Sequence, residues 1–170
     1  IVGIINSAKY KKIAIHTPFR LSKEKVLDHV VRRIDSNIEL SVLVINDKTD
    51  FFGFDPGNNG LVPFESTFIK LSAQEYLVWF EGIQPSNPKI TKRFSNPLMI
   101  KFWYTNNQEL FKDPIYKEAL LQDCINLSGA NWRGFKAKQL PVSVFYCQRI
   151  SEFIGKFRQY DMSHIDINNL

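Results

Sequence analysis

Residues 38–46, with the sequence IELSVLVIN, constrain the fold of this chain more than any other segment. Most of these residues are apolar and several are β-branched. A continuous apolar run of this length is typical of a strand that is buried on both faces of a sheet. The segment therefore predicts the central strand of a sheet.

A strand and a helix are predicted before this segment. Residues 12–16 favour a short strand that ends at Pro18, because proline cannot donate a ladder hydrogen bond. Ser22 is suited to cap a helix that has Glu24 in its first turn. The apolar residues of this helix recur at helical spacing: Val26, Leu27, Val30, Val31 and Ile34.

A turn is predicted in the middle of the chain. Residues 55–60 have the sequence DPGNNG, in which proline, glycine and asparagine all favour a reversal of the backbone. This signal predicts a hairpin between residues 51–54 and residues 61–71.

Two more strands follow. Ser72 and Glu75 match a helix capping box, but the aromatic and β-branched residues of segment 76–80 favour a strand instead. Residues 97–104, with the sequence PLMIKFWY, favour another strand for the same reason.

Two helices complete the chain. Asp113 is suited to cap the first, with Pro114 at its first position and Gly129 at its end. Its predicted apolar stripe comprises Ile115, Ala119, Leu120, Cys124 and Leu127. After Pro141, residues 144–157 favour a second amphipathic helix. Its predicted packing residues are Val144, Phe145, Ile150, Phe153, Ile154 and Phe157. The order of elements predicts an α/β fold with a mixed sheet.

The composition excludes several classes of protein. The chain has 170 residues, 44% of them hydrophobic and 23% charged, which suits one globular domain with a core. No apolar run reaches the roughly 18 residues that a membrane span needs, and no signal peptide opens the chain. Cys124 and Cys147 lack metal-ligand spacing, which favours two buried thiols in a reducing cytoplasm. Residues 1–5, IVGII, resemble a strand already under way, so we expect a fragment of a longer polypeptide.

Positive charge is unevenly distributed along the chain. The formal net charge is only +5, but residues 1–23, 82–108 and 124–151 contain cations and no acid. If these windows meet in space, they form a basic face that attracts a polyanion. If they scatter over the surface, they only aid solubility. The charge pattern by itself leaves both interpretations open.

Residues 131–146, NWRGFKAKQLPVSVFY, combine cations, amides and aromatic rings without an acid. The polar members of the segment are Asn131, Arg133, Lys136, Lys138 and Gln139. A solvated loop does not need this many aromatic residues. A nucleic acid, in contrast, offers phosphates to cations and flat bases to rings. The segment therefore predicts contact with a nucleic acid.

Several short motifs occur in the order of a known family. They are AIHTPFR (14–20), LVP leading into ST (61–67), LVWFEG (77–82), ITKRF (90–94), PLMI (97–100), LS (127–128), NWR (131–133) and LPVSV before Tyr146 (140–146). Together they resemble the C-terminal half of the PIWI domain of prokaryotic Argonaute proteins, and their details resemble the short branch made of MID and PIWI domains only. The resemblance implies an α/β, RNase H-like PIWI fold over residues 1–170, with a mixed sheet flanked by helices. It also implies that the MID domain and the early PIWI segments precede this chain.

The resemblance further implies a protein that does not cut. Active Argonautes hold two divalent cations with an Asp, a Glu, a second Asp, and a final Asp or His. The first two positions would lie upstream of this chain. The third matches His16-Thr17-Pro18-Phe19 and the fourth approximately Gln148, and neither supplies a carboxylate. We therefore expect no slicer activity here, and any enzymatic activity in a partner.

The resemblance also assigns nucleic-acid contacts. Arg133 matches a position that contacts guide-strand phosphates, which a guanidinium can bind in a bidentate way. Tyr146 either reaches a phosphate through its hydroxyl or belongs to the core, and Asn131 either bonds the sugar–phosphate backbone or caps a helix. His16 and Arg20 would lie at the catalytic cleft, where they steady the target strand or serve only the structure. The remaining predicted contacts are Lys92, Arg93, Lys136, Lys138 and Gln139.

A metal ion and partners are implied as well. In many Argonautes the C-terminal carboxylate helps to bind a divalent cation beside the 5′ phosphate of the guide. Leu170 would have this role with Mg²⁺, unless residues 166–170 are a frayed tail. The implied partners are a guide strand of RNA, a single-stranded DNA target and an APAZ-containing effector. That effector would carry a TIR, sirtuin-like or nuclease domain and act in prokaryotic defence. Two rival functions stay open: an active guided nuclease, and an interaction domain that kept only the fold.

Overall fold

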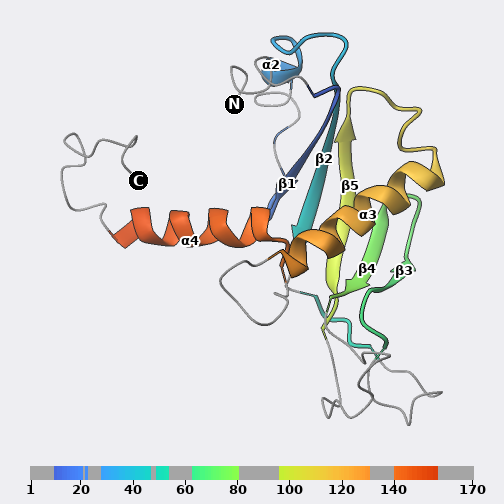
Figure 1. Ribbon diagram of the computed structural model, residues 1–170, viewed down its shortest axis with the longest axis vertical. Helices are drawn as coiled ribbons and strands as arrows, with labels where there is room; N and C mark the ends of the chain where they lie inside the picture. The colour runs from blue at the N-terminus through green and yellow to red at the C-terminus, as the bar shows by residue number, and fades with distance from the viewer. Residues whose placement is uncertain are drawn as a thin grey trace.

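The computed structural model describes residues 10–20, 22, 28–46, 49–53, 63–80, 96–130 and 140–156. Within them lies a five-stranded sheet with the order β1-β2-β5-β4-β3, and α3 runs across one of its faces (Figure 1). The strands are β1 (Lys12–Thr17), β2 (Glu39–Asn46), β3 (Thr67–Lys70), β4 (Glu75–Trp79) and β5 (Leu98–Thr105). β1 and β2 are parallel, and the other neighbours are antiparallel. The predicted mixed α/β sheet is confirmed.

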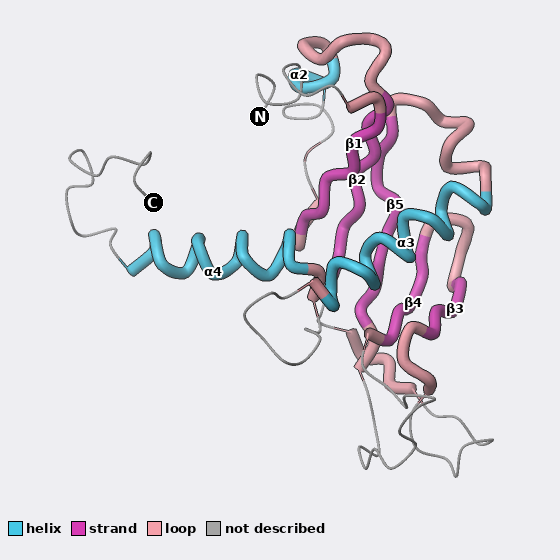
Figure 2. The backbone as a smooth tube through the Cα atoms, viewed as in Figure 1, coloured by secondary structure: helices cyan, strands magenta, loops and turns pink. Residues whose placement is uncertain are grey.

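Strand β2 is an interior strand buried on both faces, as its apolar sequence predicts, although β5 and not β2 is the middle strand of the five. It pairs with β1 on one side and with β5 on the other (Figure 2). Leu40, Val42 and Leu43 are fully buried, which shows that both faces of the strand are covered. The Asn106 side chain fixes the beginning of β2, because it accepts a hydrogen bond from the Leu40 N–H and donates one to the Ile38 carbonyl, both at 2.8 Å.

The connection from β1 to β2 contains a helix, and this helix ends earlier than the predicted apolar residues, which run to Ile34. Helix α2 spans Asp28–Val31, and Ser22 lies outside a helix; residues 23–27 lie outside the described part of the chain. Val30 and Val31 pack against a small cluster of buried residues, as their helical spacing predicts. The cluster comprises Ile34, Ile38 and Leu40.

One hairpin is formed by β3 and β4, and the predicted hairpin between residues 51–54 and 61–71 is not tested, because residues 54–62 lie outside the described part of the chain. Strand β3 pairs with β4, whereas Phe51 and Phe52 are exposed and belong to no strand. The predicted turn at 55–60 lies outside the described residues. Ser72 takes part in the tight turn between β3 and β4, where its Oγ accepts a hydrogen bond from the Gln74 N–H at 3.2 Å. The capping-box residues therefore close a turn, since local side-chain hydrogen bonds serve turns and helix ends alike.

Helix α3 spans Pro114–Gly129, and its cap is confirmed because the Asp113 Oδ1 accepts a hydrogen bond from the Ile115 N–H at 2.9 Å. The predicted apolar stripe is partly wrong, since Ile115 is 75% exposed and Ala119 is also exposed. The residues that α3 buries are Lys117, Leu120, Leu121, Cys124 and Ser128. Lys117 can lie on this side because its ammonium donates to the Ala73 carbonyl at 3.1 Å while its alkyl stem is buried.

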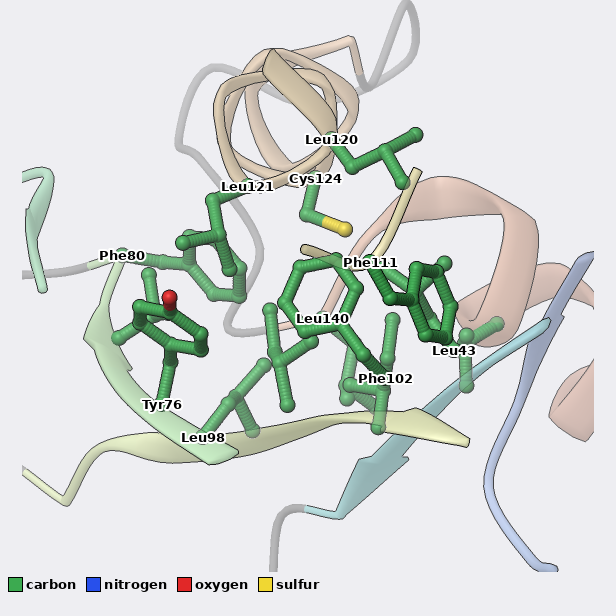
Figure 3. Close-up of a cluster of buried hydrophobic side chains, with 14 residues drawn as sticks. Leu43, Tyr76, Phe80, Leu98, Phe102, Phe111, Leu120, Leu121, Cys124 and Leu140 are labelled. Atoms are coloured by element: carbon green, nitrogen blue, oxygen red, sulfur yellow. The ribbon is translucent and has the colours of Figure 1, made fainter. Parts of the chain in front are cut away.

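The main core lies between α3 and the sheet. Figure 3 shows Leu120, Leu121 and Cys124 on the helix and Phe102 on the sheet, and all four belong to one cluster of buried side chains. Phe102 makes edge-to-face contacts with Tyr76 and with Phe111, at 5.5 and 5.3 Å between ring centroids. This cluster holds α3 on the sheet.

Helix α4 spans Val142–Lys156 and packs less than predicted. Val144 is buried and Phe145 lies against the core, but Ile150, Phe153 and Ile154 are about half exposed. The reason is that α4 contacts the sheet only near its first turns and then extends away from it (Figure 1). Phe157 lies outside the described residues.

Because α4 extends away from the sheet, the prediction for Cys147 is wrong. Cys147 on α4 is exposed, whereas Cys124 on α3 is buried, so the prediction of two buried thiols is right only for Cys124. Both are free thiols. Among the described residues, no helix is long and apolar enough to cross a membrane.

Candidate functional site at the end of strand β1

His16 links the end of β1 to both long helices. Its Nδ1 lies 2.9 Å from the Ser143 Oγ in the first turn of α4. Its Nε2 lies 3.7 Å from the Cys124 Sγ on α3. The resemblance matches the end of β1 to the third metal ligand and Gln148 on α4 to the fourth. The structure therefore places these two matched segments next to each other.

The imidazole of His16 is held in its neutral form. Burial lowers the pKa of His16, and the nearby Asp123 carboxylate opposes this shift only in part. Burial also raises the pKa of the Cys124 thiol to about 12, so this thiol keeps its proton at neutral pH. We assign the thiol proton to the hydrogen bond with Nε2, which leaves the ring proton on Nδ1 to be donated to Ser143.

This arrangement limits what the site can do chemically. A protonated Cys124 is a weak nucleophile and a poor metal ligand, because the thiolate is the reactive species. His16 has both ring nitrogens engaged within the protein. Within the described residues, no group of three or more His, Cys, Asp or Glu side chains is placed to hold a metal ion.

After His16, a tight turn sends the chain to the other face of the sheet. The Thr17 hydroxyl donates to the Phe19 carbonyl at 2.9 Å and accepts from the Phe19 N–H at 3.4 Å. Arg20 then lies over the indole ring of Trp103, with its Cζ 5.0 Å from the ring centroid.

Alternation along β5 shows that this is the face opposite α3. Ile100 and Phe102 point into the core beneath α3, so Lys101 and Trp103 point the other way. Lys101 lies 5.9 Å from the Trp103 ring centroid and forms a salt bridge with Glu75 on the neighbouring strand β4. His16 and Arg20 therefore lie on opposite faces of the sheet: His16 faces the helices, and Arg20 faces away from them. Their placement at a catalytic cleft stays a prediction.

A β-bulge directs Trp103. Val42 of β2 pairs with Tyr104, whereas the next residue, Leu43, pairs with Phe102, so Trp103 is an extra residue in its strand. Such bulges reorient side chains at particular points of a sheet. Trp103 was not among the predicted site residues. The local signal that could have indicated it is the run of three aromatic residues that begins at Phe102.

The predicted site residues on α4 differ in their exposure to solvent. Tyr146 is 37% exposed, so the alternative that it belongs to the core is wrong. Its ring lies 5.4 Å from that of Phe145, and the Arg149 guanidinium lies 5.4 Å from the same Phe145 ring. Gln148 is half buried. None of these side chains is a carboxylate.

The other predicted contacts lie outside the described residues, so the structure does not test them. They are Lys92, Arg93, Asn131, Arg133, Lys136, Lys138, Gln139 and, for the Mg²⁺ site, Leu170. Trp132 is also outside. Ser143 and Cys124, the two partners of His16, were not predicted as site residues, because nothing local in the sequence marks a contact between residues more than one hundred positions apart.

The sequence and the structure are each similar to part of a known protein. No protein-family model matches the chain. The sequence is 26% identical over 137 residues to a Piwi protein of Archaeoglobus fulgidus, an alignment that covers 75% of this chain and 30% of that protein. The structure matches the crystal structure of Marinitoga piezophila Argonaute in complex with 5′ OH guide RNA and target DNA. That match has a TM-score of 0.58 at 14% identity and covers 83% of this chain.

The fold matches part of an Argonaute structure, and the sequence is similar to part of a Piwi protein. Both findings agree with the resemblance found in the sequence and with the predicted α/β fold. The chain spans 30% of the Piwi protein and 19% of the Argonaute chain, so it corresponds to a minor part of each. Within this fold, β1 ends at the site described above.

Proposed function

We propose that this PIWI portion binds a guide strand of RNA together with a single-stranded DNA target, and that it does not cut the target. The observation that carries the proposal is the state of His16 at the end of β1. At the position that the resemblance matches to the third metal ligand, a neutral imidazole is hydrogen-bonded to Ser143 and Cys124.

The nucleic-acid part of the proposal rests on charge and on a structural neighbour. The Argonaute with the matching fold was crystallised with guide RNA and target DNA. This chain concentrates its cations in windows without acids. In guided systems, base pairing reads the sequence and the protein mainly contacts the backbone, so cations and hydroxyls are the groups that binding needs.

The chemistry of two-metal catalysis supports the proposed absence of cutting. Two divalent cations need several carboxylate or imidazole ligands that are free to bind them. Residues 16–19 supply no carboxylate, and His16 would have to break both of its hydrogen bonds to become a ligand. The Gln148 amide on α4 is neutral, so it is a weak replacement for a charged ligand.

The proposed role of the bound complex is to activate an APAZ-containing effector with a TIR, sirtuin-like or nuclease domain. This step comes from the family resemblance. Exposed apolar residues on α4 support it, because Ile150 and Ile154 lie on the part of the helix that extends from the sheet and could contact a partner protein. They line a hollow of about 500 Å³ together with Cys147, Ser151 and Gly155.

Copurification tests the binding step. Nucleic acid is extracted from the protein purified from its host, end-labelled, and digested with ribonuclease or deoxyribonuclease. Short 5′-phosphorylated RNAs of discrete length are expected. If no nucleic acid copurifies and added guides fail to bind at low salt, the protein is instead an interaction domain that kept only the fold.

Charge reversal gives a matched control for that assay. Arg93→Glu with Arg133→Glu is expected to abolish copurified RNA. Arg32→Glu with Lys112→Glu makes the same change in net charge at exposed positions outside the predicted surface, and is expected to retain the RNA. Equal loss in both proteins would show that binding depends only on total charge.

A cleavage assay tests the second step. The guide-loaded protein is incubated with labelled complementary DNA and Mn²⁺ or Mg²⁺, and intact target is expected. A product cut at one position opposite the guide would establish the rival function, an active nuclease, and would require metal ligands from outside the described residues.

A further inference from the structure

The Arg20 guanidinium lies over the indole ring of Trp103. Its Cζ lies 5.0 Å from the centroid of the Trp103 ring, which is the geometry of a cation–π contact. Arg20 is exposed and, within the described part of the chain, forms neither a hydrogen bond nor an ion pair. Since no described residue accepts a hydrogen bond from this guanidinium, its five N–H donors stay available for a ligand.

The surrounding charges leave this site cationic. Lys101 lies near the same ring, but its ammonium is paired with Glu75. The hydrogen bond from Lys101 lowers the pKa of Glu75, and Arg20 contributes to the same shift, so the carboxylate is ionised at neutral pH. One acid therefore balances one of the two cations, and Arg20 supplies the remaining charge.

The turn and the bulge explain why Arg20 lies here. The Thr17–Phe19 hydrogen bonds reverse the chain at the edge of the sheet, and the extra residue in β5 brings the Trp103 ring to the face that the chain then crosses. Trp79, the other tryptophan described on this face, is buried and has Gly53 close to its indole nitrogen, so it offers no such platform.

We propose that Arg20 binds a phosphodiester of the nucleic-acid strand, and that Trp103 is the positioning residue that holds its guanidinium in the binding orientation. The planar fork of an arginine edge matches two oxygens of one phosphate group. This contact lies on the face of the sheet opposite α3 and is separate from His16. The inference rests on the proposed function, because it assigns a contact to the bound strand.

The experiment measures binding of a 5′-phosphorylated RNA guide paired with complementary DNA, at several salt concentrations. Arg20→Met is expected to weaken binding roughly tenfold, the loss typical of a charge-assisted hydrogen bond. It is also expected to reduce the slope of log K against log salt by about 1, because one phosphate contact is lost. Arg32→Met removes the same charge from an exposed position elsewhere. It is expected to cause neither the tenfold loss of affinity nor the change in the salt slope.

Trp103 is tested through its dependence on Arg20. Trp103→Leu is expected to weaken binding in wild-type protein but to have no further effect in the Arg20→Met background, because it acts only through that guanidinium. Trp103→Tyr, which keeps an aromatic face, is expected to restore most of the affinity. An equal loss from Trp103→Leu in both backgrounds would overturn the positioning role, and if that variant fails to fold, the tyrosine variant and Arg20→Met decide.

The outcomes separate this inference from the proposed function. If wild-type protein binds no guide at low salt, the proposed function fails and this contact fails with it. If wild-type protein binds and Arg20→Met behaves like Arg32→Met, the nucleic-acid function stands and the Arg20 contact is overturned.

Discussion

At the scale of single residues, His16 shows how a position is changed by its surroundings. The imidazole lies at the end of a strand in a site that the sequence matches to a metal ligand, yet its two nitrogens face a hydroxyl and a thiol. These two bonds hold the neutral ring between β1, α3 and α4. His16 therefore has a structural role that can be tested by pH.

We expect the protein to lose stability in mild acid through His16. Its folded-state pKa lies below the ordinary value of 6.5, mainly because of burial, so the unfolded chain takes up the proton first as the pH falls. The contribution of His16 protonation to the free energy of unfolding is absent well above pH 6.5. It becomes unfavourable as the pH falls from 6.5 toward the folded-state pKa. Thermal unfolding at about pH 7.5 and about pH 5 measures this loss.

His16→Gln provides the control for that measurement. The amide keeps hydrogen-bonding capacity but does not titrate, so the variant is expected to lose less stability than the wild type between the two pH values. Identical losses in the two proteins would show that other groups, and not His16, cause the acid sensitivity.

At the scale of elements, the two long helices differ in how much of each the sheet supports. Helix α3 has a side-chain cap and buries residues along most of its length. Helix α4 buries Val144 in its first turn and then leaves the sheet. Its stability over the last turns therefore depends on its own sequence and on whatever protein or nucleic acid it contacts.

The cap of α3 gives a prediction at this scale. Asp113→Ala removes the acceptor for the Ile115 N–H and is expected to lower the free energy of unfolding by about 1 kcal/mol. Asp113→Asn retains an acceptor oxygen and is expected to cost much less. Urea denaturation monitored by circular dichroism measures both; equal losses would indicate that the negative charge, and not the hydrogen bond, is what stabilises the helix.

At the scale of the whole molecule, one aromatic cluster joins the sheet to α3. Phe102 is fully buried at its centre, between Tyr76 and Phe111 (Figure 3). Because the core lies mainly on one face of the sheet, the loss of this ring would loosen β5 and α3 together.

Truncation of this ring should have a large effect. Phe102→Ala is expected to cost about 3–5 kcal/mol, since it removes a buried ring and leaves a cavity. Phe68→Ala is the matched control, because Phe68 is 40% exposed on the edge strand β3 and is expected to cost much less. Chemical denaturation of the two variants measures the difference, and similar costs would show that the core is not centred on Phe102.

The sequence by itself determined the elements and part of their order in space. The apolar run at 38–46 identified an interior strand buried on both faces, and Asp113 with Pro114 identified the beginning of α3. These signals are local: burial on both faces demands a continuous apolar strand, and an N-cap needs only the next few residues. The family motifs added the PIWI fold for the same reason, because short motifs in a fixed order can be recognised without coordinates.

Only the tertiary structure decided how the candidate site is arranged. It placed His16 against Cys124 and Ser143, and it sent Arg20 to the other face of the sheet. It also left Ile150 exposed on a helix whose pattern suggested packing. The physical reason is that the direction of a side chain depends on turns, bulges and contacts between residues far apart in sequence, which no local pattern records.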